Sequence, residues 1–132
     1  MSTSMPSISE AEWRVMNVLW EKSPQTANEI ISSLQGQTDW NPKTVRTLLN
    51  RLVQKNAVGV NQNQRVYTFY PLYSQNECQH AEAQSFLQRI YSGALKSMLV
   101  QFIQKESLSD EEIQELRSIL DAKQASTEHP KK

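Results

Sequence analysis

The sequence has 132 residues, of which 38% are hydrophobic and 8% aromatic, and its formal net charge is zero. This length suits one compact domain, or a small domain with an appended element, and the low apolar content favours a helical protein that depends on self-association. The single cysteine excludes an internal disulfide. With no signal-peptide pattern and no apolar run of about 18 residues, the sequence predicts a cytoplasmic protein that does not enter a membrane.

The neutral total hides an uneven distribution of charge. Residues 1–73 hold seven Lys and Arg against five Asp and Glu, a balance of +2, whereas residues 74–132 hold seven against nine, a balance of −2. From Trp40 to Asn76 the chain has five cations and no carboxylate. Because an anionic partner responds to the local charge, this run predicts a surface that contacts nucleic acid.

The first part of the sequence predicts two short helices in succession. Ser9 and Glu12 have the spacing of a capping box and precede apolar residues at helical intervals, which predicts a helix over 10–21. The same pattern recurs at TANE and predicts a second helix over 27–34, which ends at Gly36.

A third predicted helix carries the basic residues. Asn41 suits the N-cap and Pro42 the first helical position, and the apolar residues that follow recur at the spacing of a buried stripe. Arginine can donate two hydrogen bonds to guanine, lysine can contact guanine or phosphate, and threonine methyls can meet thymine methyls. The opposite face is therefore predicted to contact DNA in the major groove, through Lys43, Thr44, Arg46, Thr47, Asn50 and Arg51.

Two β-rich runs follow this helix, AVGV and RVYTFY, and the turn-forming run NQNQ separates them. They predict a two-stranded hairpin. Three helices followed by a hairpin is the order of a winged helix-turn-helix, in which the third helix reads DNA and the hairpin is the wing. Arg65 in the wing is expected to add a contact to the DNA backbone or minor groove.

The second part of the sequence predicts three more helices with apolar stripes. Capping boxes at Ser74 with Glu77 and at Ser109 with Glu112 begin two of them. Three short helices cannot bury this much apolar surface among themselves, which predicts a dimer. The predicted interface consists of Phe86, Leu87, Ile90, Leu95, Met98, Leu99, Phe102, Ile103, Ile113, Leu116, Ile119 and Leu120.

The expected protein is mainly α-helical with a small β hairpin. Residues 1–73 are predicted to form a winged helix-turn-helix DNA-binding domain, residues 74–122 a helical dimerisation domain, and residues 123–132 a flexible tail.

The polar face of the third helix has two other interpretations besides DNA binding. A polar helix face is also typical of a solvated helix, and a winged helix can dock a protein, but the missing carboxylates favour DNA, since a carboxylate there would face phosphates. Trp13, Trp20 and Trp40 are expected to be structural rather than base-stacking residues.

Enzyme chemistry finds little support in the sequence. Cys78 and His80 suggest a metal or thiol site, but two ligands one residue apart do not complete a tetrahedral site, which favours a buried or half-buried helix cysteine. No Gly-rich phosphate loop, H-E-x-x-H or G-x-S-x-G occurs. No enzymatic activity, metal or cofactor is predicted.

Three motifs, ISEAEWRVMNVLW, DWNPKTVRTLLNRLVQK and LSDEEIQELRSIL, resemble the bacterial penicillinase and methicillin-resistance repressors, the BlaI/MecI family, between Ile8 and Leu120. The resemblance implies a homodimer whose winged-helix domains bind an inverted-repeat operator in double-stranded DNA and repress β-lactam resistance genes. The family's reading helix corresponds to Lys43 through Lys55.

The resemblance also implies how repression ends. A sensor-linked protease inactivates members of the family by cutting the dimerisation helix between a polar residue, typically Asn, and Phe; the matching pair here is Gln101 and Phe102. A sister branch of copper-responsive repressors resembles the same N-terminal half but ends in paired C-x-C motifs, whereas Cys78 is alone. A copper-responsive or other stress-responsive repressor without that metal site is the alternative expectation.

Overall fold

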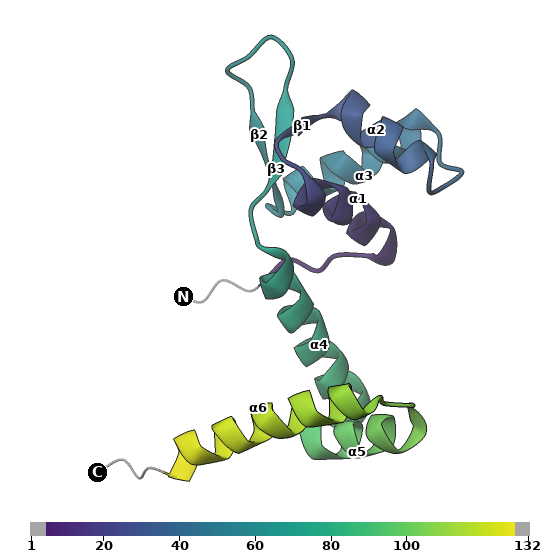
Figure 1. The fold of residues 1–132 in the computed structure, drawn as a ribbon. Coiled ribbons are helices and arrows are strands. Elements are labelled where there is room, and N and C mark those ends of the chain that lie inside the picture. Colours follow the sequence, from purple (N-terminus) through teal and green to yellow (C-terminus); the bar gives the residue numbers. More distant parts are fainter. Residues whose placement is uncertain (1–4, 129–132) are drawn as a thin grey trace. The chain divides into compact units, whose positions relative to one another are not determined.

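The computed structural model describes residues 5–128, and the chain forms two compact units, Met1–Gln84 and Ser85–Lys132 (Figure 1). The division falls inside helix α4 (Gln75–Tyr91), whereas the sequence predicts a boundary after residue 73. Within the described residues, no helix is both long enough and apolar enough to span a bilayer.

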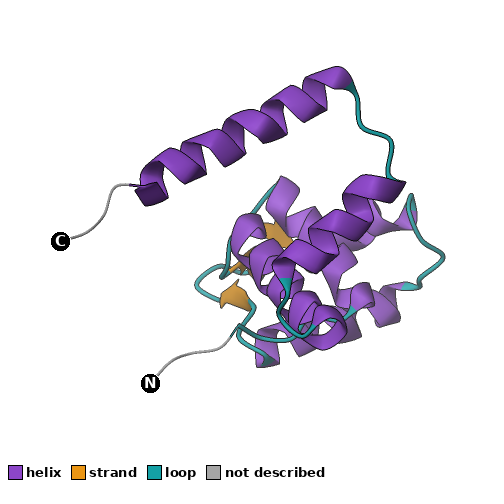
Figure 2. Ribbon diagram, turned by 90° about the horizontal axis from the view of Figure 1, so that it is seen from below, coloured by secondary structure: helices purple, strands orange, loops and turns teal. Residues whose placement is uncertain are grey.

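The first unit is a winged helix, as predicted, and it contains the predicted helices and hairpin. Its elements in chain order are α1 (Glu10–Glu21), β1 (Gln25–Thr26), α2 (Ala27–Gln35), α3 (Pro42–Gln54), β2 (Val58–Asn61), β3 (Thr68–Pro71) and the first part of α4. The strands are short beside the helices (Figure 2) and form one antiparallel sheet in the order β1-β3-β2. The predicted hairpin of β2 and β3 is present, but the prediction missed the third strand, β1. This strand has only two residues, too few to show an alternating apolar pattern in the sequence.

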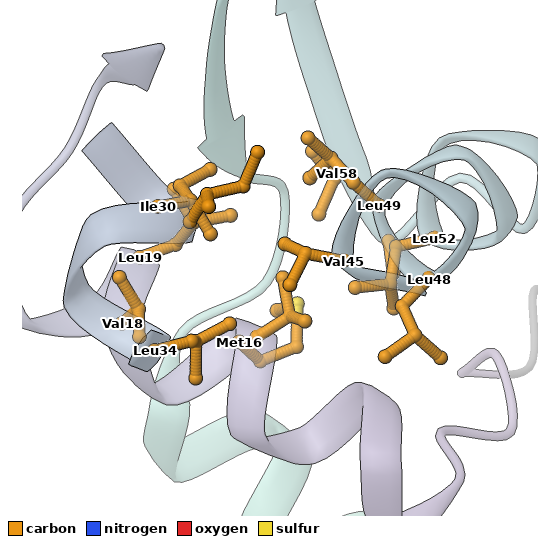
Figure 3. Packing of buried hydrophobic residues seen from close by; sticks show 13 residues of the cluster. Met16, Val18, Leu19, Ile30, Leu34, Val45, Leu48, Leu49, Leu52 and Val58 are labelled. Carbon is orange, nitrogen blue, oxygen red and sulfur yellow. The ribbon is translucent and has the colours of Figure 1, made fainter. Parts of the chain in front are cut away.

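The core of this unit lies where α1, α2, α3 and β2 meet (Figure 3). Each helix buries one apolar stripe, and α3 does so at the spacing that the sequence predicts. With this stripe turned inward, the cationic side of α3 faces outward. The core residues are Val15, Met16, Val18, Leu19, Ile30, Ile31, Leu34, Val45, Leu48, Leu49, Leu52, Ala57 and Val58.

The predicted helix starts are confirmed by their hydrogen bonds. The Ser9 hydroxyl accepts from the Glu12 amide at 3.1 Å, and the Glu12 carboxylate accepts from the Ser9 amide at 2.9 Å. The same reciprocal box begins α2. At α3, the Asn41 side chain accepts from the Thr44 amide at 2.9 Å, and Pro42 begins the helix.

Glu12 also joins the start of α1 to the end of α3. Its side chain is 2% exposed, and the carboxylate accepts a hydrogen bond from Lys55, whose ammonium also donates to the Ser7 carbonyl at 2.7 Å. Burial alone raises the pKa of this carboxyl. The hydrogen bonds and charge of Lys55, together with the hydrogen bonds from Ser9, outweigh burial and leave the pKa of Glu12 below its ordinary value.

The wing depends on one glycine. Gly59 of β2 pairs with Tyr70 of β3, and the Tyr70 ring lies across the space that a side chain at Gly59 would occupy. A Cβ at this position would lie 2.4 Å from the ring, which real contacts do not allow. The aromatic ring therefore covers the glycine and packs the two strands of the wing together.

The second unit contains the end of α4, then α5 (Leu95–Lys105) and α6 (Asp110–Glu128). The predicted capping boxes at the starts of α4 and α6 are both present. Gly93, with a φ of +82°, lies in the turn between α4 and α5. Helix α6 continues past residue 123, the predicted start of a tail, because good helix formers such as Ala and Lys sustain it without an apolar stripe. The rest of the predicted tail, 129–132, lies outside the described residues.

The buried carboxylate makes the stability of the first unit sensitive to acid. The pKa of Glu12 is lower in the folded chain than its ordinary 4.5. The ionised carboxylate therefore stabilises the fold fully at pH values above 4.5, and this contribution to the free energy of unfolding is lost as the pH falls through the folded pKa. We expect Glu12→Gln to remove this part of the pH dependence and to lower the free energy of unfolding near neutral pH by about 2 kcal/mol. Urea unfolding measured between about pH 3 and 7 checks both effects.

Glu10→Gln is the matched control, since it removes an exposed carboxylate from the same helical turn. Equal acid sensitivity in Glu12→Gln and the unaltered protein would contradict the assigned role of Glu12.

Candidate nucleic-acid interface

The outward face of α3 brings together the residues predicted to read DNA. Its inward side is fixed by the core, so residues three and four apart on the other side form one surface. Thr44 is half-buried at the edge of this surface. Its exposed members are Lys43, Arg46, Thr47, Asn50 and Arg51.

No carboxylate lies on this face, since the chain has none from Trp40 to Asn76. Within residues 5–128, the Glu12 carboxylate forms an ion pair with Lys55, and no ion pair involves Lys43 or Arg51. These cations remain available to phosphates, and binding them releases the counterions that surround DNA.

Lys55 does not belong to this face, although it ends the segment that matches the family's reading helix. It is the C-cap of α3, and its ammonium is held by Glu12 and the Ser7 carbonyl. Its charge is therefore used within the fold. The sequence does not indicate this pairing, because Glu12 lies 43 residues earlier in the chain.

Asn28 is a residue that the sequence analysis missed. It lies in the first turn of α2, and its side-chain oxygen accepts a hydrogen bond from Nη2 of Arg46 at 3.0 Å. This contact joins α2 to the exposed face of α3. The sequence shows only a polar residue near the start of the second helix, and it does not indicate the contact with Arg46, which lies 18 residues further along the chain.

Arg65 lies in the loop between β2 and β3 rather than in the strand that the RVYTFY run predicts. Strand β3 begins only at Thr68, because the chain bends after β2: the Asn61 side chain accepts from the Asn63 amide at 3.2 Å, as in an Asx turn. Arg65 and its neighbours Val66 and Tyr67 are exposed, and the loop forms the tip of the hairpin (Figure 1).

The tryptophans have structural surroundings, as predicted. The rings of Trp13 and Trp20 meet edge to face with centroids 5.4 Å apart, and the Trp20 indole donates to the Tyr73 carbonyl at 3.0 Å. Trp20 and Trp40 pack against the core of the first unit.

Cys78 is a buried helix residue, which confirms the preferred interpretation. Burial raises the pKa of its thiol, and the nearby Glu77 carboxylate raises it further, so the reactive thiolate is disfavoured. Across the part of the chain that the structure describes, no three His, Cys, Asp or Glu side chains are grouped so as to hold a metal ion.

The residues predicted to form a dimer interface lie on α4, α5 and α6, and none of the twelve is buried in the single chain. Helix α5 has no buried residue at all. Ile119 and Leu120 of α6 are each 64% exposed.

Gln101 and Phe102, the pair that matches the family's cleavage position, lie within α5 and are exposed. The Tyr91 hydroxyl at the end of α4 donates to the Gln101 side-chain oxygen at 3.0 Å. The peptide bond between the pair is part of a regular helix.

Known proteins are similar to this chain over most of its length. The family model described as penicillinase repressor matches residues 8–122. The methicillin resistance regulatory protein MecI of Staphylococcus aureus strain N315 is 38% identical over 123 residues, which cover 93% of this chain and 100% of MecI. The penicillinase repressor of Bacillus licheniformis is 39% identical over 117 residues, which cover 89% of this chain and 91% of that protein.

Solved structures match the winged helix. The solution structure of the DNA-binding domain of the repressor BlaI aligns with a TM-score of 0.51 at 36% identity, over 58% of this chain and 93% of that one. The monomeric form of Bacillus licheniformis BlaI, solved in complex with the blaP half-operator, aligns with the same TM-score and identity over 56% of this chain and 90% of that one. The matching motifs, the winged-helix fold and these relatives together place the chain in the penicillinase repressor family of DNA-binding proteins.

Proposed function

We propose that this protein is a dimeric cytoplasmic repressor that binds a dyad-symmetric DNA operator and controls β-lactam resistance genes. The observation that carries the proposal is the outward face of α3, which presents exposed cations and hydrogen-bonding side chains and has no carboxylate. The complex of BlaI with a half-operator supports DNA as the partner, and the names of the relatives support the class of genes.

In this proposal α3 enters the major groove. Arg46 and Arg51 donate to base edges, Lys43 contacts guanine or phosphate, and the threonine methyls meet thymine methyls. Arg65 at the tip of the wing contacts the DNA backbone or minor groove. The first turn of α3 has no acidic side chain, so the partial positive charge at the N-terminus of this helix is not neutralised. This charge also favours the binding of phosphate.

The proposed partner of the second unit is a second copy of the chain. Its three helices have apolar stripes that the single chain leaves exposed or half-buried. A twofold axis lets the same stripes cover one another, and it presents two reading helices to the two halves of a palindrome.

Release is proposed to occur by proteolysis between Gln101 and Phe102. The peptide bond is in the middle of α5, so cleavage divides the apolar stripe of that helix and separates α6 from the rest. The reading helix would stay intact, but the link between two half-site readers would be lost, and with it their effective concentration.

Salt dependence and two substitutions test the DNA-reading face. Operator affinity should fall steeply with salt. Lys43→Ala should lower the salt slope by about one unit with an even loss on all sequences where Lys43 contacts phosphate, and should cost more on the preferred duplex where it contacts guanine. Arg46→Ala should cost about 1 to 3 kcal/mol on the preferred duplex and less on a random duplex. Fluorescence anisotropy titrations at several salt concentrations give both quantities.

Arg89→Ala is the matched control, because it removes an exposed arginine from α4. A salt slope near zero for the unaltered protein would refute DNA binding through this face.

Ile119→Glu and Leu120→Glu test the dimer. Both side chains are already exposed in the single chain, so the substitutions should leave its helices folded but place a charge in the proposed interface. We expect the dimer dissociation constant to rise by at least about tenfold, as measured by sedimentation. Gln114→Glu on the same helix is the control, and a monomeric unaltered protein at about 10 μM would contradict the dimer.

Gln101→Asn tests the release step, since it restores the residue typical of the family. In cells that contain the cognate sensor protease and a β-lactam, we expect cleavage after residue 101, and faster cleavage of the variant. Mass spectrometry of the fragments identifies the bond. Derepression with an intact chain would show that release follows another route.

A further inference from the structure

We propose that Asn28 of α2 positions the Arg46 guanidinium and thereby sets the base selectivity of α3, without reading a base itself. The inference rests on the proposed function, because it assigns a positioning residue to one of its reading residues.

The geometry places a neutral acceptor beside a base-reading donor. Nη2 of Arg46 donates to Oδ1 of Asn28 at 3.0 Å, and both residues are exposed at the surface that carries the reading face. The backbones of the two residues are held in place by the core, since α2 and α3 pack together through buried residues such as Ile30 and Val45. A side chain held by a rigid neighbouring element keeps its geometry more closely than one free in solvent.

The contact leaves Arg46 able to bind DNA. A guanidinium has five N–H donors, and Asn28 accepts one, so four donors remain, including the second hydrogen of Nη2. These are enough for the bidentate contact that arginine makes with guanine.

The neutrality of the acceptor matters for the same reason that carboxylates are absent from α3. An aspartate at this position would pair with Arg46 and compete with DNA for its charge. The carboxylate that follows Asn28 in the sequence, Glu29, does not bind Arg46 but accepts a hydrogen bond from the Thr26 amide at 2.8 Å, as part of the capping box of α2. Asn28 thus orients the arginine without neutralising it.

The expected effect is one of preorganisation. A free arginine side chain samples many rotamers and loses this freedom when it reads a base, whereas an arginine already held by Asn28 loses less. Loss of Asn28 should therefore weaken binding to the preferred duplex by about three- to tenfold. A random duplex demands no single geometry of Arg46, so its affinity should change less.

The test uses the full chain and two duplexes: one selected from a randomised pool by the unaltered protein, and a random one of equal length. Asn28→Ala should reduce affinity for the selected duplex by the stated factor and for the random duplex by less than about twofold. In the background of Arg46→Ala, the same change should have no effect, since the two residues act as a unit. Asn28→Asp should weaken binding to both duplexes, because the added charge repels phosphates.

Ser32→Ala, an exposed change one turn further along α2, is the matched control, and unchanged thermal unfolding of every variant shows that the fold is intact. Equal losses on both duplexes, tighter binding by Asn28→Ala, or a loss that persists without Arg46 would each overturn the role of Asn28. If the unaltered protein selects no preferred duplex, the proposed function itself fails, which is a separate result.

Discussion

The buried carboxylate of Glu12 makes the interaction on which the position of α3 depends. It closes the capping box of α1 and also accepts from Lys55 at the end of α3. An unpaired carboxylate at this depth would be strongly unfavourable, so the ammonium of Lys55 has to stay beside it. Helix α3 is therefore held at its C-terminal end by a charge and along its inner side by the core. Both contacts keep the polar side of α3 facing outward.

The capping residues of the helices differ between α3 and most of the others. Helices α1, α2, α4 and α6 all have a Ser or Thr cap with a Glu three residues later, which satisfies backbone donors and compensates the dipole. Two helices depart from this pattern: α5 begins after Ala94 with no side-chain cap, and α3 is capped by Asn41, with Thr44 where the four capping boxes have Glu. A capping-box carboxylate there would lie where phosphates are proposed to bind. The helix gives up some local stability and keeps a positive end.

The sequence predicts the helices well because caps and apolar periods are local, and the structure confirms them, although α6 continues to Glu128 through part of the predicted tail. It fails where partners are distant along the chain. Strand β1 is too short to show a period, and the partners of Lys55 and Arg46 lie 43 and 18 residues away. The six residues of α3 predicted to contact DNA could be assigned to one face from their spacing, whereas only the structure excludes Lys55 and identifies Asn28.

The two units differ in how they can be stable. The first unit has a core of its own, whereas no residue of α5 is buried in the single chain. A unit without an interior gains its stability from whatever covers it, so in the proposed dimer the folding of α5 and α6 would depend on protomer concentration. The folding of α3 would not, because Glu12, Lys55 and the core that hold this helix all lie in the first unit. Loss of the dimer would then lower operator affinity through effective concentration alone and leave the chemistry of the reading face unchanged.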